Sequence, residues 1–192
     1  MKITKSIIFA CLIIVFQMSV LSESYNNDVI IKNPTNTPVT IYKSISQKKD
    51  AFGVNYLSEI RKLDNIIYAK CLYSANYGFE GDPVGYQIET KDNIKGWVSL
   101  ENVWFPGKVQ NVKNNDVLNI RIKESESSDI TDKLINGDTL YINASYIINT
   151  MGHRGAEPTD WVPVFTKNQK IGYAKMSYIN IVFPNISKFN KL

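Results

Sequence analysis

The chain has 192 residues, of which 44% are hydrophobic and 21% are charged, and its formal net charge is +4. Its basic residues are scattered and build no dense stripe for a phosphate backbone, so we expect no nucleic-acid partner. The single histidine and the one cysteine beyond residue 24 do not supply three zinc ligands with recognisable spacing, and we expect neither a metal nor a cofactor.

The first 24 residues differ in composition from the rest of the chain. Lys2 and Lys5 precede an unbroken apolar run, residues 7–16, and small residues follow it. This pattern predicts a cleavable signal peptide over residues 1–24, and hence an exported protein, periplasmic or secreted. The run is short for a bilayer, so we expect no stable membrane span in the mature chain. An uncleaved anchor, a buried helix or a lipoprotein modified at Cys11 are the alternatives.

One nine-residue stretch occurs twice. Residues 90–98 return without a gap as residues 166–174, and each copy has a polar turn followed by glycine and an aromatic residue. Alternating apolar residues before the turn predict a β-hairpin in each copy. The two glycines, Gly96 and Gly172, are too far apart for a solenoid repeat, so the repeat indicates two small β domains in tandem.

The first domain is predicted to span residues 25–106. Its expected strands are residues 29–31, 39–42, 66–73 and the repeated hairpin, with a turn at residues 33–36. Residues 44–50 and 74–83 lack apolar periodicity and are predicted to be loops. Residues 54–63 fit either a helix or an irregular loop, because apolar residues recur at spacing three. Residues 100–104 close the domain, and Pro106 and Gly107 mark its boundary.

The second domain is predicted to span residues 107–183, followed by a C-terminal tail, residues 184–192. Its expected apolar segments are residues 117–121, 130–134, 139–142, the second hairpin and residues 178–182. Asn136 and Gly137 form a strong turn signal between two of them. Residues 149–160, which contain two glycines and a proline, are predicted to be a loop.

The second domain resembles the bacterial SH3-like (SH3b) family. The resemblance rests on Leu118-Asn119-Ile120-Arg121, a Ser-rich gap, Gly137-Asp138, Trp161-Val162-Pro163-Val164, Gly172-Tyr173-Ala174 and Tyr178-Ile179. It covers about residues 113–182, and the first domain is a more divergent copy that matches through Gly96-Trp97-Val98. The resemblance implies an all-β chain of two small SH3-like β-barrels. In exported bacterial proteins such domains mostly bind, are often associated with the cell wall and commonly accompany a hydrolase.

Catalytic chemistry is poorly supported. A cysteine hydrolase would have to pair Cys71, in a predicted core strand of the first domain, with His153, in a loop of the second. Acidic residues cluster in a polar stretch, residues 124–129, which is typical of a solvated surface rather than of a glycosidase pair. We therefore predict no catalytic residues and no enzyme.

Aromatic residues near the ends of the hairpins favour binding, because flat rings bury area with little loss of entropy. Trp97, Trp161 and Tyr173 could equally be core residues, and Trp104 with Phe105 could join the two domains. The loop that contains Arg154 is a plausible contact with a ligand. The candidate ligand-binding residues are Trp104, Phe105, Arg154, Trp161 and Tyr178.

These patterns predict a non-enzymatic, exported binding or adaptor protein of the bacterial cell envelope, whose partner is peptidoglycan or an envelope protein. The alternative is a secreted protein–protein interaction factor, such as an inhibitor or a host-directed protein, without cell-wall binding. An enzyme would instead release muropeptides and depend on His153.

Overall fold

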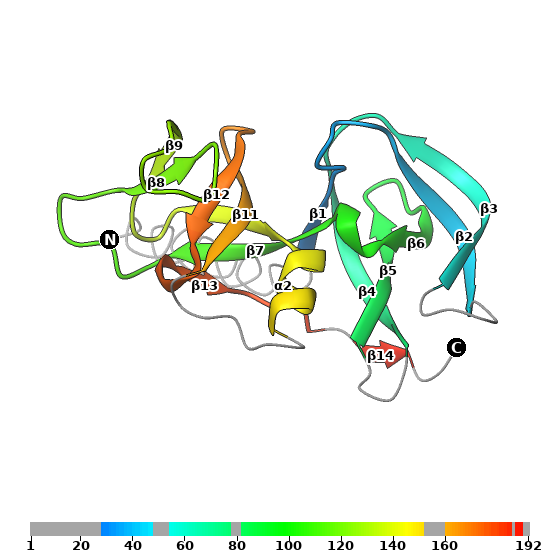
Figure 1. Ribbon diagram of the computed structural model, residues 1–192. Coiled ribbons are helices and arrows are strands. Elements are labelled where there is room, and N and C mark those ends of the chain that lie inside the picture. Colours follow the sequence, from blue (N-terminus) through cyan, green and yellow to red (C-terminus); the bar gives the residue numbers. More distant parts are fainter. Residues whose placement is uncertain (1–27, 48–53, 78–81, 152–159, 186, 190–192) are drawn as a thin grey trace, which may run out of the picture.

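The computed structural model describes residues 28–47, 54–77, 82–151, 160–185 and 187–189 (Figure 1). Strands dominate these residues, so the all-β prediction is confirmed. The predicted signal peptide lies outside them. No helix among the described residues is both long and apolar enough to cross a membrane.

Most of the elements are strands that short turns connect. In chain order they are β1 (Asp28–Ile31), β2 (Val39–Gln47), β3 (Val54–Leu63), β4 (Ile67–Tyr77), β5 (Asp82–Thr90), β6 (Lys95–Ser99), the 3-10 turn η2 (Leu100–Asn102), β7 (Val103–Val109), β8 (Leu118–Arg121), β9 (Ile130–Leu134), β10 (Thr139–Asn143), the helix α2 (Ala144–Met151), β11 (Trp161–Thr166), β12 (Ile171–Lys175), the 3-10 turn η3 (Met176–Tyr178), β13 (Ile179–Ile181) and β14 (Ser187–Phe189).

The same strand order occurs twice in the sheet. In the first half, residues 28–109, the order is β3-β2-β6-β5-β4-β1-β7, and in the second half, residues 103–181, it is β9-β8-β12-β11-β10-β7-β13. β7 therefore ends the first half and begins the second, and Figure 1 shows it running from one lobe to the other. The pairings form one open sheet, and no pairing among the described strands closes it into a ring.

Both predicted hairpins are confirmed, and their turns are alike. Thr90 N–H donates to Ile94 O at 3.0 Å, and Thr166 N–H donates to Lys170 O at 2.9 Å. In each turn the threonine hydroxyl also donates to a carboxylate, that of Asp92 in the first half and that of Asp132 in the second. A 3-10 turn follows each hairpin, so the repeat in sequence is a repeat in local structure.

The prediction of a helix or an irregular loop at residues 54–63 is wrong, because these residues form the strand β3. It pairs with β2 in antiparallel register, with an irregularity between Ile41 and Tyr42. A bulge of this kind adds one residue to a strand and breaks the alternation of side chains between faces. The spacing of three between apolar residues therefore reflects a bulged strand, and Leu57 and Ile60 are exposed on it.

Other predicted loops are shorter than expected, because strands extend into them. β2 continues to Gln47 and β4 to Tyr77, while residues 48–53 and 78–81 lie outside the described residues. The predicted loop at residues 149–160 begins inside α2, a helix that the sequence did not indicate to us. Asn143 caps this helix, since its Oδ1 accepts from Ser145 N–H at 3.1 Å. Part of the predicted tail forms β14, which pairs with β4 in parallel.

Pro106 and Gly107 do not form a turn at a domain boundary, as the sequence suggested, but lie inside β7. Pro106 is opposite Tyr141 of β10, and its carbonyl accepts from Val182 N–H at 2.8 Å. Gly107 is buried where a Cβ would lie 2.9 Å from Ile179 Cγ2, so glycine lets β13 approach the strand closely. Pro106 and Gly107 therefore belong to the strand that continues the sheet from one half to the other.

The two halves share a hydrophobic core. One cluster of buried residues includes Val29 and Ile88 of the first half together with Leu140 and Val164 of the second. A smaller cluster joins Trp104 of β7 to residues from both halves, Ile30 and Phe165. Burial of apolar surface across this junction is the main force that holds the halves together.

The repeated glycines should be intolerant of any side chain. A Cβ at Gly172 would lie 2.7 Å from Arg121 O and from Ile120 Cγ2, and one at Gly96 would lie 2.7 Å from Tyr42 O. We expect Gly172→Ala and Gly96→Ala each to lower the free energy of unfolding by about 1–3 kcal/mol, the usual cost of overpacking.

Chemical denaturation of each variant tests this expectation. Lys170→Ala, at an exposed turn residue of the same hairpin, is the matched control and should unfold near the wild-type midpoint. A glycine variant as stable as the wild type would show that β6 or β12 can move away from its neighbour.

Candidate binding cleft

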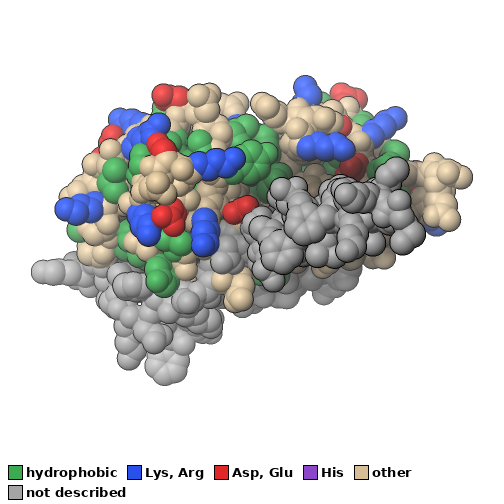
Figure 2. Space-filling view, turned by 180° about the vertical axis from the view of Figure 1, so that it is seen from behind, with side chains coloured by type: hydrophobic (Ala, Val, Ile, Leu, Met, Phe, Trp, Pro, Cys, Tyr) green, Lys and Arg blue, Asp and Glu red, His purple; other side chains and the backbone are tan. Residues whose placement is uncertain are grey.

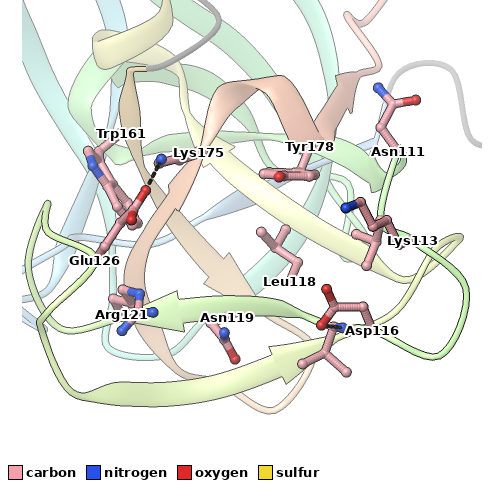
Figure 3. A pocket seen from close by; sticks show the side chains of 12 residues that line it. Asn111, Lys113, Asp116, Leu118, Asn119, Arg121, Glu126, Trp161, Lys175 and Tyr178 are labelled. Carbon is pink, nitrogen blue, oxygen red and sulfur yellow. Dashed lines mark hydrogen bonds and ion pairs between the residues drawn. The ribbon is translucent and has the colours of Figure 1, made fainter.

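A cleft of about 320 Å³ opens on the second half of the molecule. Its lining comes from the segment before β8, from β8 itself, from the loop after β8, and from the ends of β11, β12 and η3. Figure 3 shows Trp161, Lys175 and Glu126 together at one end, Asn111, Lys113 and Asp116 at the other, and Tyr178 and Leu118 between them. The lining is thus apolar and aromatic in the middle and charged at both ends.

The two aromatic rings are positioned by backbone pairing. Trp161 begins β11, opposite Lys175 at the end of β12, and its carbonyl accepts from Tyr146 Oη of α2 at 2.6 Å. Tyr178 ends η3, and its carbonyl accepts from Gln110 N–H at 2.9 Å. Both side chains are half-buried. They therefore offer ring surface to a ligand from a rigid frame.

A lysine and its acidic partner lie near the Trp161 ring. Lys175 Nζ lies 5.6 Å from the centre of that ring and forms an ion pair with Glu126. The hydrogen bond from Lys175 lowers the pKa of Glu126 below its ordinary value, so the glutamate is ionised at neutral pH. Arg121 Nη1 donates to Ser128 O at 2.6 Å and so ties the end of the loop to β8.

The side chains of the cleft could contact a ligand in two ways. Aromatic rings give area, and charges of both signs at the rim give orientation. No group of three or more His, Cys, Asp and Glu side chains among the described residues is placed to hold a metal ion.

The structure brings together two of the five predicted site residues. Trp161 and Tyr178 line the cleft. Trp104 is completely buried, and its Nε1–H donates to Lys32 O at 2.9 Å, while Phe105 is also in the core. The suggestion that Trp104 and Phe105 meet a ligand is therefore wrong for this structure, because both side chains join the two halves instead. Arg154 lies outside the described residues.

Sequence reasoning missed the charged residues at the Trp161 end of the cleft. Lys175, Glu126 and Arg121 come from three separate segments, and each is an ordinary surface residue in its own stretch of sequence. A usable signal did exist for Lys175, because it ends the repeated hairpin two residues after Tyr173. Its counterpart in the first copy is Ser99, and a difference between two copies points to a difference in function.

In the first half, side chains fill the equivalent surface. At the position of Trp161 it has Gly85, which pairs with Ser99 as Trp161 pairs with Lys175. The space over Gly85 is taken by Tyr56 of β3, whose hydroxyl donates to Val84 O at 3.0 Å. Tyr56 also packs on Tyr42, with ring centres 5.0 Å apart. Burial raises the pKa of Tyr56 to about 12, so the phenol stays neutral there.

Helix α2 adds to this difference between the halves. It belongs to the second half but packs against η2 of the first, and Asn143 Nδ2 donates to Glu101 O at 2.8 Å. In the second half the equivalent carbonyl, that of Ser177, accepts from Asn111 Nδ2 on the rim of the cleft. Among the described residues, α2 thus covers the surface next to η2, whereas the surface next to η3 forms part of the cleft.

Charge is mixed on the part of the surface that Figure 2 shows for the described residues. On the face in Figure 2, Lys and Arg side chains are interspersed with Asp and Glu, and the described residues show no continuous basic band there.

The cysteine considered for nucleophilic catalysis lies away from the cleft. Cys71 is in β4 of the first half and is 1% exposed, as expected for a core cysteine. Burial raises the pKa of its thiol to about 12, whereas a nucleophilic cysteine needs a lowered pKa. His153, the base that it would need, lies outside the described residues.

The raised pKa of Cys71 predicts a thiol that does not react in the native protein. At pH 8 the thiolate is the reactive form, and it is scarcely populated when the pKa is about 12. We expect an alkylating reagent to label Cys71 only after unfolding, as read by mass spectrometry of the peptide that contains it. Rapid labelling of the native protein would contradict the buried position.

Comparison with known proteins gives little beyond this geometry. No protein-family model matches the sequence, and no curated protein matches it. Among solved structures, the chain is similar to NlpC2 from Trichomonas vaginalis, with 13% identity and a TM-score of 0.28 over 82% of this chain and 49% of that one. NlpC1 from the same organism gives 14% identity and a TM-score of 0.28 over 82% and 47%. The chain thus spans about half the length of these proteins, and the likeness is too distant to assign a function.

Proposed function

We propose that this chain is an exported, non-enzymatic binding protein of the bacterial cell envelope, built from two SH3-like barrels. Its partner is peptidoglycan or an envelope protein, and its ligand site is the cleft on the second half. The observation that carries the proposal is the exposure of Trp161 and Tyr178 in one cleft with charges of both signs. Peptidoglycan offers matching groups, since its sugars have flat apolar faces and its stem peptides carry charged ends.

The SH3-like part of the proposal is supported by the repeated strand order. Each half has the same succession of hairpin, 3-10 turn and final strand. The segment with the family's Leu-Asn-Val-Arg pattern is β8, and the segments with its Trp-Val and Gly-Tyr patterns are β11 and β12. Because a fold does not determine a function, the proposed ligand rests on the cleft and not on the barrel.

Export rests on the N-terminal sequence alone. Residues 1–24 have the three-part pattern of a signal peptide, and we propose that they direct the chain out of the cytoplasm. A cleavable signal would place the cleft where peptidoglycan is found.

A second candidate function is protein–protein interaction through β3. This strand ends the sheet order and pairs only with β2 among the described strands. Leu57 and Ile60 are each 43% exposed on it, and a free strand edge can accept an extended segment of a partner protein. A secreted inhibitor or host-directed factor would use such an edge and would not need the cleft.

Sedimentation with purified peptidoglycan sacculi tests the main proposal. We expect the wild-type protein to pellet with sacculi and Trp161→Ala to bind at least about tenfold more weakly, because truncating a central aromatic anchor commonly costs more than about 1–2 kcal/mol. Tyr68→Ala, which removes another exposed aromatic outside the cleft lining, is the matched control and should pellet like the wild type.

The alternatives give different results in the same assay. A wild-type protein that stays in the supernatant would refute peptidoglycan binding, and co-purification with a defined protein, lost in a Leu57→Lys variant, would then favour the β3 edge. Release of soluble muropeptides would contradict the non-enzymatic assignment.

A further inference from the structure

An ion pair lies at the Trp161 end of the cleft, and its carboxylate occupies the position that a carboxylate of a ligand could take. Lys175 Nζ lies 5.6 Å from the centre of the Trp161 ring, and Glu126 supplies a carboxylate to the same ammonium group. Figure 3 shows this pair beside the ring, at one end of the lining. A cation, a carboxylate and an aromatic face are therefore assembled where a ligand would enter.

The two partners of this ion pair differ in how firmly they are held. Lys175 ends β12, lies against the Trp161 ring and has a side chain that is 30% exposed. Glu126 sits in the loop between β8 and β9, and its side chain is 73% exposed. Because exposed ion pairs are weak and readily exchanged, the glutamate is the partner that a competing group can replace.

Displacing Glu126 changes the charge of the cleft. With it, the charged side chains in the lining are three cations (Lys113, Arg121 and Lys175) and two anions (Asp116 and Glu126). Without it, three cations face one anion. The emptied position therefore favours an incoming anion, and an incoming cation would have to displace the more buried Lys175.

We propose that the cleft recognises a free carboxylate of a peptidoglycan stem peptide, which takes the place of Glu126 at Lys175. The peptide chain next to that carboxylate lies on the Trp161 ring, and Leu118 and Tyr178 extend the surface along the cleft. Glu126 is thus an internal competitor that the ligand must displace. This inference rests on the proposed function and adds to it the chemical group that is bound.

The first half cannot make the same exchange. The residue in register with Lys175 is Ser99, and the residue in register with Trp161 is Gly85. Tyr56 Oη lies over Gly85 there, only 2.7 Å from where a Cβ would be. Carboxylate recognition of this kind therefore belongs to the second half.

Binding of a soluble stem peptide tests the inference directly. The probe is a stem tripeptide with free carboxylates, compared with the same peptide amidated at every carboxylate, and titrated into the whole protein by isothermal calorimetry. We expect amidation to weaken binding about tenfold or more, since a charge-assisted hydrogen bond is lost. Lys175→Gln should weaken binding of the free peptide to a similar extent and leave binding of the amidated peptide nearly unchanged.

Glu126→Gln gives the sharper result, because a structural role and a competing role predict opposite changes. We expect this variant to bind the free peptide several-fold more tightly than the wild type, since the internal carboxylate is gone. Glu124→Gln removes the same charge from the same loop without touching Lys175, and it is the matched control. Equal or weaker binding by Glu126→Gln than by Glu124→Gln would overturn the proposal.

Failure of the inference and failure of the proposed function are distinguishable. If free and amidated peptides bind equally, or if sacculi pellet the protein but neither peptide binds, carboxylate recognition is wrong and envelope binding stands. If neither sacculi nor peptides bind, the proposed function fails and the inference fails with it.

Discussion

The shared strand β7 is the constraint on which the rest of the structure depends. It pairs with β1 of the first half, with β10 of the second and with the closing strand β13. Its side chains supply Trp104 and Phe105 to the common core, and Gly107 allows the close approach of β13. Most of its residues are buried whichever face they are on, which explains why Trp104 and Phe105 belong to the core and not to a binding surface.

The shared strand also influences which surfaces of the two halves are covered. Because β7 continues directly into the second half, α2 of that half comes to lie against η2 of the first. The first half keeps the frame but fills its equivalent surface with Tyr56, whereas the second half presents Trp161 over an open cleft. The two halves therefore share a frame and differ in the surface built on it, and in our proposal the paired Lys175 and Glu126 give the cleft of the second half its preference for a carboxylate.

Local signals in the sequence predicted the parts of the fold that local physics controls. The two hairpins were predictable because their turn residues and alternating apolar residues lie within a few positions of one another, and Asn136–Gly137 marked a turn for the same reason. β3 was not predictable from its pattern, since a bulge opposite Ile41 and Tyr42 disrupts the alternation. Helix α2 is only eight residues long, too short for a clear period.

The candidate site was predictable only in part. Trp161 and Tyr178 were grouped as candidates because they lie at the ends of the second hairpin, and the structure places both in the lining of one cleft. Trp104 was predicted to contact a ligand because Pro106 and Gly107 after it resemble a domain boundary. Its burial depends on the pairing of β7 with strands on both sides, which come from distant parts of the sequence, so no local pattern could show it. Lys175 and Glu126 meet through tertiary structure, so no stretch of sequence could show their pairing.

The most direct test of this account is a nuclear magnetic resonance titration of the isotopically labelled protein with soluble muropeptides. The account predicts shifts confined to the second half, at the Trp161 indole N–H and the Tyr178 and Lys175 amides, with Tyr56 and Asn102 unmoved in the first. Shifts of equal size in both halves, or in the first half alone, would contradict the claim that the ligand binds only in the cleft of the second half and that Tyr56 blocks the equivalent surface of the first.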